Sequence, residues 1–158
     1  MNFLAGTALV VNVIYTLALY AGMAYSLYYI AKGNNVPHPW IAFIPVLQYY
    51  IIGSLCEEYV VLGFRIRHLQ WSMVGLELLQ TLLGFLGGFL LFPLRILVNL
   101  LLVLVLHKFF YLFEPRRAVF YAFLTMLGRL PLTILLFLLK DKPMVMSAGA
   151  FPYPFARR

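Results

Sequence analysis

The chain has 158 residues, of which 64% are apolar and only 11% are charged, and its net charge is +7. A soluble domain carries about 45–50% apolar and about 25% charged residues, so a soluble fold of this composition would expose aggregating apolar surface. The hydrophobicity also excludes a disordered chain, and the single cysteine, Cys56, excludes a disulfide-stapled secreted module. We therefore expect an all-α integral membrane protein, with one polytopic domain over 1–142 and a polar, proline- and aromatic-containing tail over 143–158.

The first apolar segment contains no charged side chain before Lys32. It exceeds the ~20 residues that a helix needs to cross the hydrocarbon core. It also lacks the basic start of a secretory signal and is longer than a signal's ~7–15 apolar residues, so 3–31 is predicted to span. Within it, Ala18, Gly22 and Ser26 form a small-residue stripe typical of close helix packing, although small residues are also common in membrane helices generally.

The second apolar segment, 40–55, follows a proline-containing turn at 34–39 and is interrupted by Pro45. Its 16 residues would extend about 24 Å as a helix, less than the ~30 Å hydrocarbon core. The segment is predicted to be non-spanning or re-entrant. Local thinning of the bilayer would be needed for it to cross.

The third apolar segment, 69–94, is long enough to span and contains one charged residue, Glu77. Gly84 and Gly88 form a second candidate pair for close helix packing. We expect this span to end at Pro93.

The fourth apolar segment, 96–113, is predicted to span in the opposite direction, with His107 and Lys108 close enough to its end to reach the headgroups. The last segment, 118–139, is interrupted by the sequence at 128–131. It is predicted either as a proline-kinked span or as a re-entrant hairpin whose arms would each reach about 15 Å.

The distribution of Lys and Arg bears on these alternatives through the positive-inside rule. If all five segments cross, the two sides hold six and five basic residues, and the split is the same if only 40–55 fails to cross. It becomes nine to two if only 118–139 turns back, and ten to one if both turn back. The charge count therefore favours a terminal hairpin, whereas the segment's length favours a span.

Two charged residues lie far from any predicted interface, Glu77 and Arg129. Glu77 lies about 12 Å along its helix from Leu69, and Arg129 lies about 16 Å from Ala118. Both distances start from the same membrane face, so we expect the two side chains to form a buried ion pair. The pair is interpreted either as a packing clasp or as part of a proton or ion path.

No catalytic, cofactor or metal site is predicted. His38, His68 and His107 are far apart in sequence and lack the close spacing of a metal-binding helix. Cys56 and the glutamates that follow it are interpreted as a polar loop at headgroup level, with no nucleophile, base and acid that converge.

The residues around the second segment form a pattern that is also seen in other membrane proteins. Pro39-Trp40-Ile41-Ala42-Phe43-Ile44-Pro45, followed by Gln48, Tyr50 and Gly53, resembles a stretch in small, uncharacterised, polytopic bacterial membrane proteins, where asparagine is usual in place of Gln48. The resemblance covers about residues 28–70 and implies the inner membrane of a Gram-positive-type bacterium. Physically, Trp40 would anchor this interfacial segment at the headgroups, and Gln48 would help to satisfy carbonyls freed by Pro45.

The functional hypotheses are therefore two. The first is a non-enzymatic subunit or accessory of a membrane complex, which associates with a membrane protein partner or with itself through the small-residue faces. The alternative is a small transporter, channel or lipid-handling protein with Glu77 and Arg129 on the path. The basic loops favour contact with anionic lipid over nucleic acid, because they flank membrane segments.

Overall fold

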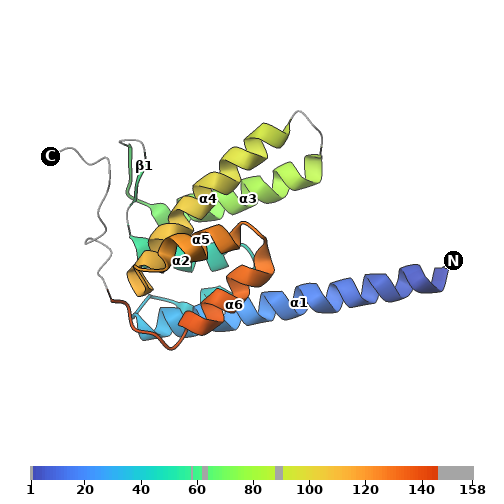
Figure 1. The fold of residues 1–158 in the computed structure, drawn as a ribbon, viewed down its shortest axis with the longest axis horizontal. Helices are drawn as coiled ribbons and strands as arrows, with labels where there is room; N and C mark the ends of the chain where they lie inside the picture. The colour runs from blue at the N-terminus through green and yellow to red at the C-terminus, as the bar shows by residue number, and fades with distance from the viewer. Residues whose placement is uncertain (1, 58, 62–63, 88–90, 146–158) are drawn as a thin grey trace.

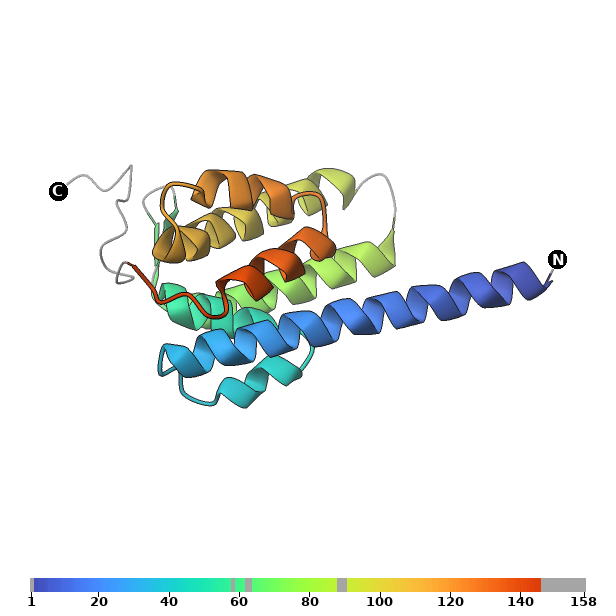
Figure 2. The same ribbon diagram turned by 60° about the horizontal axis from the view of Figure 1, so that its bottom comes forward.

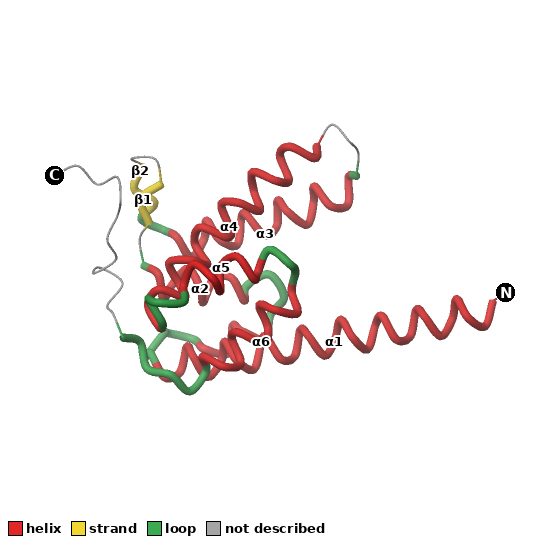
Figure 3. Tube along the Cα trace, in the orientation of Figure 1, coloured by secondary structure: helices red, strands yellow, loops and turns green. Residues whose placement is uncertain are grey.

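The computed structural model describes residues 2–57, 59–61, 64–87 and 91–145 (Figure 1). The regular elements of this part of the chain are helices and one short β-hairpin, joined by loops (Figure 3). In chain order the elements are α1 (Asn2–Gly33), the 3-10 helix η1 (Pro39–Phe43), α2 (Gln48–Cys56), β1 (Tyr59–Val61), β2 (Phe64–Ile66), α3 (Leu69–Leu86), α4 (Phe92–Phe113), α5 (Ala118–Thr125) and α6 (Arg129–Leu139).

Three helices, α1, α3 and α4, are long and apolar enough to cross a membrane. The prediction of an all-α fold with three such helices is confirmed, but the boundary between the last two was wrong. The predicted span 69–94 ends at Leu86, and Pro93 lies in the first turn of α4 instead of ending α3. A proline is tolerated there because the first amides of a helix have no partner within it.

The segment 40–55 is not one helix. The short helix η1 runs back along α1, where the Tyr20 hydroxyl donates a hydrogen bond to the Phe43 carbonyl. Tyr20 is 13 residues before the end of α1 at Gly33, about 20 Å along the helix. The chain then turns and returns as α2, whose last carbonyl, at Cys56, accepts a hydrogen bond from Lys108 near the C-terminal end of α4.

The segment 118–139 also turns back, as the helical hairpin α5–α6. Gly128, at φ +127°, lies immediately before α6 in a backbone region that side chains rarely adopt. After α6, Lys142 Nζ lies 3.3 Å from Glu114 Oε2, and the Val145 amide donates to the Leu112 carbonyl over 2.8 Å. The hairpin therefore ends where it began, beside the C-terminal end of α4 (Figure 2).

The hydrophobic core is concentrated toward the end of the molecule at which these hairpins begin and end. Its buried side chains come from the C-terminal part of α1, from α2, from parts of α3 and α4, and from α5 and α6. The antiparallel pair β1–β2 lies at the same end, where a polar loop was expected, and it pairs Tyr59 with Ile66 (Figure 1). The N-terminal part of α1, residues 6–18, is exposed throughout and projects away from the other helices (Figure 2).

The closest backbone approach that a glycine permits is at Gly53 of α2. A Cβ on Gly53 would lie 2.5 Å from Gln70 Cα and 2.8 Å from the Leu69 carbonyl oxygen, so α2 packs directly on the start of α3. On Gly22 a Cβ would lie 3.0 Å from Thr133 Cγ2 of α6. Gly84, by contrast, has nothing within 4 Å, so it makes no close helix contact within the described chain.

A polar cavity at the Glu77–Arg129 pair

The structure brings Glu77 of α3 and Arg129 of α6 together. Arg129 Nη2 donates to Glu77 Oε1 over 2.9 Å. The two side chains differ in burial, because that of Glu77 is 7% exposed and that of Arg129 is 67% exposed. The expected contact is therefore present, but the expectation that both charges are buried was wrong for Arg129. Its guanidinium is left accessible because α6 packs mainly on α1 and not over α3.

Tyr49, in the first turn of α2, lines the same cavity as Glu77. Arg129 is the first residue of α6. The N-terminal ends of two short helices, α2 and α6, thus meet at the cavity that Glu77 of α3 lines. Neither helix has a side-chain hydrogen bond at its N-cap, Leu47 or Gly128. Because amide groups at a helix N-terminus carry partial positive charge, both ends are electrostatically suited to a negative group.

A cavity of about 380 Å³ adjoins this junction. Ligand pockets in proteins are commonly about 300–1,000 Å³, so its size falls within that range. The cavity lies between helices that are long and apolar enough to span a membrane, yet many of its lining side chains are polar. The polar and charged lining residues are Tyr49, Glu77, Gln80, Thr81, Arg95, Asn99, Thr125 and Arg129.

The lining supplied by α4 changes along the helix. Arg95 and Asn99, near the start of α4, are polar, whereas Leu102, Val103 and Leu106 farther along it are apolar. These positions follow the three- and four-residue spacing of one helical face. The cavity is thus charged toward one end of α4 and hydrophobic toward the other.

The charges that line the cavity do not cancel. Arg95 and Arg129 contribute two positive charges and Glu77 one negative charge, which leaves one positive charge. The Gln80 side chain lies on the same lining, and its Oε1 is buried without a hydrogen-bond partner among the described residues. Sequence reasoning found Glu77 and Arg129 but missed Arg95 and Asn99 of α4 and Thr125 of α5, because nothing in the sequence indicates that these two helices share a cavity with α3.

Lys108 was expected to reach the headgroups, and this was wrong. Its side chain is fully buried, and its Nζ donates to the Cys56 carbonyl over 2.7 Å. The Tyr59 ring lies 5.7 Å from the same ammonium. A lysine at a helix C-terminus satisfies an orphan carbonyl and complements the negative end of the helix, so Lys108 caps α2 from α4.

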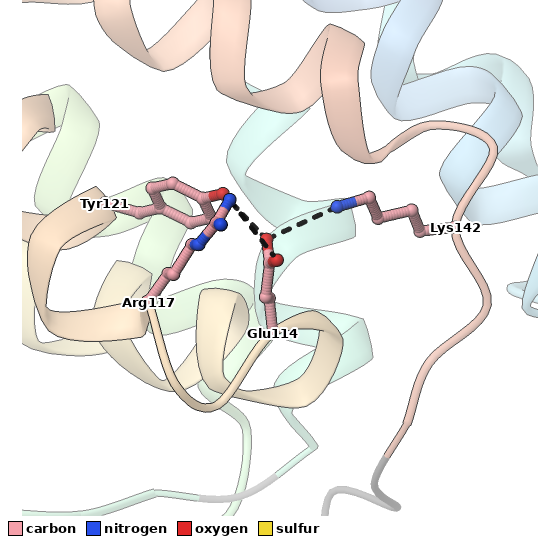
Figure 4. Close-up of polar contacts among 4 residues, drawn as sticks. All are labelled: Glu114, Arg117, Tyr121 and Lys142. Atoms are coloured by element: carbon pink, nitrogen blue, oxygen red, sulfur yellow. Dashed lines mark hydrogen bonds and ion pairs between the residues drawn. The ribbon is translucent and has the colours of Figure 1, made fainter.

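A second polar cluster fixes the open end of the α5–α6 hairpin (Figure 4). Glu114 Oε2 accepts a hydrogen bond from Tyr121 over 2.7 Å and one from Lys142 over 3.3 Å. Arg117 Nη1 lies 3.8 Å from the other oxygen of Glu114. The hydrogen bond from Tyr121, followed by the contacts with Lys142 and Arg117, holds the pKa of Glu114 below its usual value.

The residues predicted to form an interfacial segment, Trp40, Pro45 and Gln48, differ in exposure. Trp40 is 56% exposed and Pro45 is exposed, at the break between η1 and α2. Gln48 is buried, but its Nε2 has no hydrogen-bond partner among the described residues, so it does not satisfy the freed carbonyls with its amide donor. The Tyr50 ring instead packs edge-on against Trp71, with centroids 5.2 Å apart.

The two small-residue stripes behave differently. Gly22 and Ser26 lie on the face of α1 that contacts the rest of the protein, and the Ser26 hydroxyl donates to the Gly22 carbonyl. Ala18 is exposed, and Gly88 lies outside the described residues. Packing of the Ala18 and Gly84 surfaces against another protein stays a prediction.

Among the described residues, no group of three or more His, Cys, Asp or Glu side chains is arranged to hold a metal ion. Cys56 is buried in the core. No known protein family, curated protein or solved structure matches the chain. A function must therefore be inferred from the cavity and its surroundings.

Proposed function

We propose that the protein is a multi-pass membrane protein of the transporter or lipid-handling class, and that the cavity beside Glu77 and Arg129 is its ligand site. The observation that carries the proposal is a cavity of about 380 Å³ with charged walls, placed among membrane-length apolar helices. Ionisable residues inside a membrane are costly and are therefore usually functional.

The arrangement of charges supports an orientation for this proposal. Among the described residues, eight basic residues lie near or beyond the C-terminal ends of α1, α4 and α6 or in the connection between α2 and α3, whereas Arg95 lies near the N-terminal end of α4. The eight are Lys32, Arg65, Arg67, Lys108, Arg116, Arg117, Lys140 and Lys142. The C-terminal ends of α1 and α4 lie at the same end of the molecule (Figure 1). By the positive-inside rule that end is cytoplasmic, and the N-terminus of α1 is on the opposite side.

In this orientation η1–α2 and α5–α6 are two re-entrant hairpins that enter from the cytoplasmic side. Each brings the N-terminal end of a short helix to mid-membrane depth, at the cavity that Glu77 lines. Broken helices whose ends meet at the midplane are characteristic of transporter binding sites, where the freed backbone lines a cavity. We place the protein in a bacterial cell membrane, consistent with the resemblance of residues 28–70 and with the basic residues at one end.

Thiol accessibility tests whether the cavity is open to water. Thr81 lines the cavity, whereas its neighbour Leu82, which is 53% exposed, does not. In a Cys56→Ala background in membrane vesicles, Thr81→Cys should react with a charged, water-soluble thiol reagent much faster than Leu82→Cys, which lipid should cover. Equal rates at the two positions would contradict an aqueous cavity.

A second candidate is the accessory-subunit function, favoured by the N-terminal part of α1. Residues 6–18 are exposed throughout, so this half-helix contacts lipid or a partner instead of its own bundle. Mild-detergent purification should recover a stoichiometric membrane partner if this function holds. Loss of that partner in Ala18→Leu, with no loss in Leu17→Ala, would assign the contact to the small-residue face.

A further inference from the structure

The cavity's unbalanced charge indicates what kind of group it would hold. Two arginines and one glutamate line it, and Arg129 already uses Nη2 to bind Glu77. Within the described part of the chain, no acidic side chain forms an ion pair with Arg95. A net positive charge beside membrane-length apolar helices is unfavourable unless a counter-charge is present. A ligand with one negative charge would leave the site neutral.

The donors around the cavity narrow the chemistry further. Guanidinium groups match the oxygens of a phosphate through paired, charge-assisted hydrogen bonds. The amide of Asn99 and the hydroxyl of Thr81 add uncharged donors, and the α6 N-terminus adds partial positive charge. The remaining lining, Leu102, Val103 and Leu106, is apolar and suits the hydrocarbon part of an amphiphile.

Resting on the proposed function, we infer that the cavity binds a phosphate group carrying one net negative charge, between Arg95 and Arg129. Arg95 lies toward the start of α4 and would meet the phosphate as it enters from that side. Arg129, held by Glu77, would present its remaining N–H groups at a fixed position. Glu77 is a positioning residue, since it orients the arginine and carries the same sign of charge as the ligand.

The same phosphate chemistry is found in an anionic phospholipid and in aqueous phosphate, and the experiment separates these sources. The full-length protein in maltoside micelles is titrated with phosphatidylglycerol, with phosphatidylcholine, and with sodium phosphate against sodium chloride of equal ionic strength. The thermal unfolding midpoint is followed, because a ligand that binds the folded state raises it in a saturable way. Native mass spectrometry counts the bound lipids.

Two single-charge variants make the test specific to the cavity. Arg95→Gln removes a lining charge, whereas the matched control Arg116→Gln removes an exposed charge that does not line the cavity. We expect phosphatidylglycerol or phosphate to raise the midpoint of the wild type, and Arg95→Gln to weaken the apparent affinity about tenfold. Arg116→Gln should leave it unchanged. Stabilisation by the lipid alone identifies a lipid source, and stabilisation by the salt identifies an aqueous one.

The inference is overturned if neither anion stabilises the protein more than phosphatidylcholine and chloride do, or if the two variants weaken binding equally. A reactive Thr81→Cys in that case would retain the aqueous cavity and reject only the phosphate ligand. An unreactive Thr81→Cys would reject the ligand site itself. The two failures are therefore distinguishable.

Discussion

The two helical hairpins, η1–α2 and α5–α6, both reach the cavity beside Glu77, but they are packed differently. Both bring the N-terminal end of a short helix to the cavity that Glu77 lines. Tyr49 of α2 lines the cavity, and Arg129 of α6 lines it and donates a hydrogen bond to Glu77. In α2, seven of nine residues are buried, whereas in α6 five of eleven are. The α2 backbone also touches α3 at Gly53, whereas the tip of the other hairpin, at Met126 and Leu127, is exposed.

The cavity therefore has one firmly packed wall, formed by α2, and one less tightly packed wall, formed by the α5–α6 hairpin. Segments with fewer buried contacts open at a lower free-energy cost. The α5–α6 hairpin, which carries Arg129, is therefore the element whose movement would change access to the cavity, while α2 keeps Tyr49 and Glu77 in place. Substitutions at four places in the molecule sharpen this comparison.

The largest effect is expected at Gly53. In Gly53→Ala the new Cβ would collide with the Gln70 backbone, which cannot rotate away, so α2 must shift. The free energy of unfolding should fall by about 3 kcal/mol. Gly75→Ala is the matched control, since nothing lies within 4 Å of that position. Equal midpoints for the two variants in detergent would contradict the tight α2–α3 contact.

The next largest effect is expected at the ion pair. Arg129→Gln leaves the buried Glu77 carboxylate without its cation and should destabilise by about 2 kcal/mol, less than a fully enclosed pair because Arg129 is largely exposed. Glu77→Gln should cost less, since the arginine it leaves behind faces the cavity. The double variant should be about 1 kcal/mol more stable than the sum of the singles predicts, as measured by a double-mutant cycle. Strict additivity would show that the pair is not coupled.

A smaller effect is expected at the hinge of the α5–α6 hairpin. Gly128 has φ +127°, so Gly128→Ala should destabilise by about 1 kcal/mol without any steric clash. Gly84→Ala, in open space within α3, should be neutral or slightly stabilising. If both substitutions leave the unfolding midpoint unchanged, the sharp turn at Gly128 is not required.

The smallest effect is expected at Glu114, and it depends on pH. Since the pKa of Glu114 is lower in the folded protein than its usual 4.5, its contacts stabilise above that value. This contribution is lost as the pH falls through the lowered pKa. Glu114→Gln should therefore cost about 0.5 kcal/mol at neutral pH, and the difference from wild type should vanish in acid. A difference that grows in acid would contradict the assigned sign.

Sequence alone predicts the parts of this fold that depend on hydropathy and depth. The long helices follow from apolar runs with few charges. The Glu77–Arg129 contact follows from distances to one membrane face, about 12 Å and about 16 Å, that agree within one helical turn. The charge split of ten to one also pointed to the arrangement in which both proline-broken segments turn back. The long helices, the ion pair and the two turning segments can be predicted because each depends only on the depth of residues along the membrane normal.

The rest depends on tertiary contacts that have no local signal. Lys108 looks like an interfacial lysine until α2 places a carbonyl beside it. Pro93 marks a helix boundary from sequence, but not whether the helix ends before it or begins there. The cavity needs Arg95 and Asn99 of α4 on the same lining as Thr125 of α5, and this requires the packing of separate helices.

In the proposed orientation, the α5–α6 hairpin enters and leaves by the same side of the membrane and so places Arg129 at the cavity. Single cysteines at Arg116, before α5, and Pro143, after α6, test this arrangement directly in a Cys56→Ala background. Each is labelled from one side of sealed, oriented vesicles with an impermeant reagent. We expect both cysteines to be labelled from the cytoplasmic side, because Lys142 contacts Glu114. Labelling from opposite sides would contradict this arrangement.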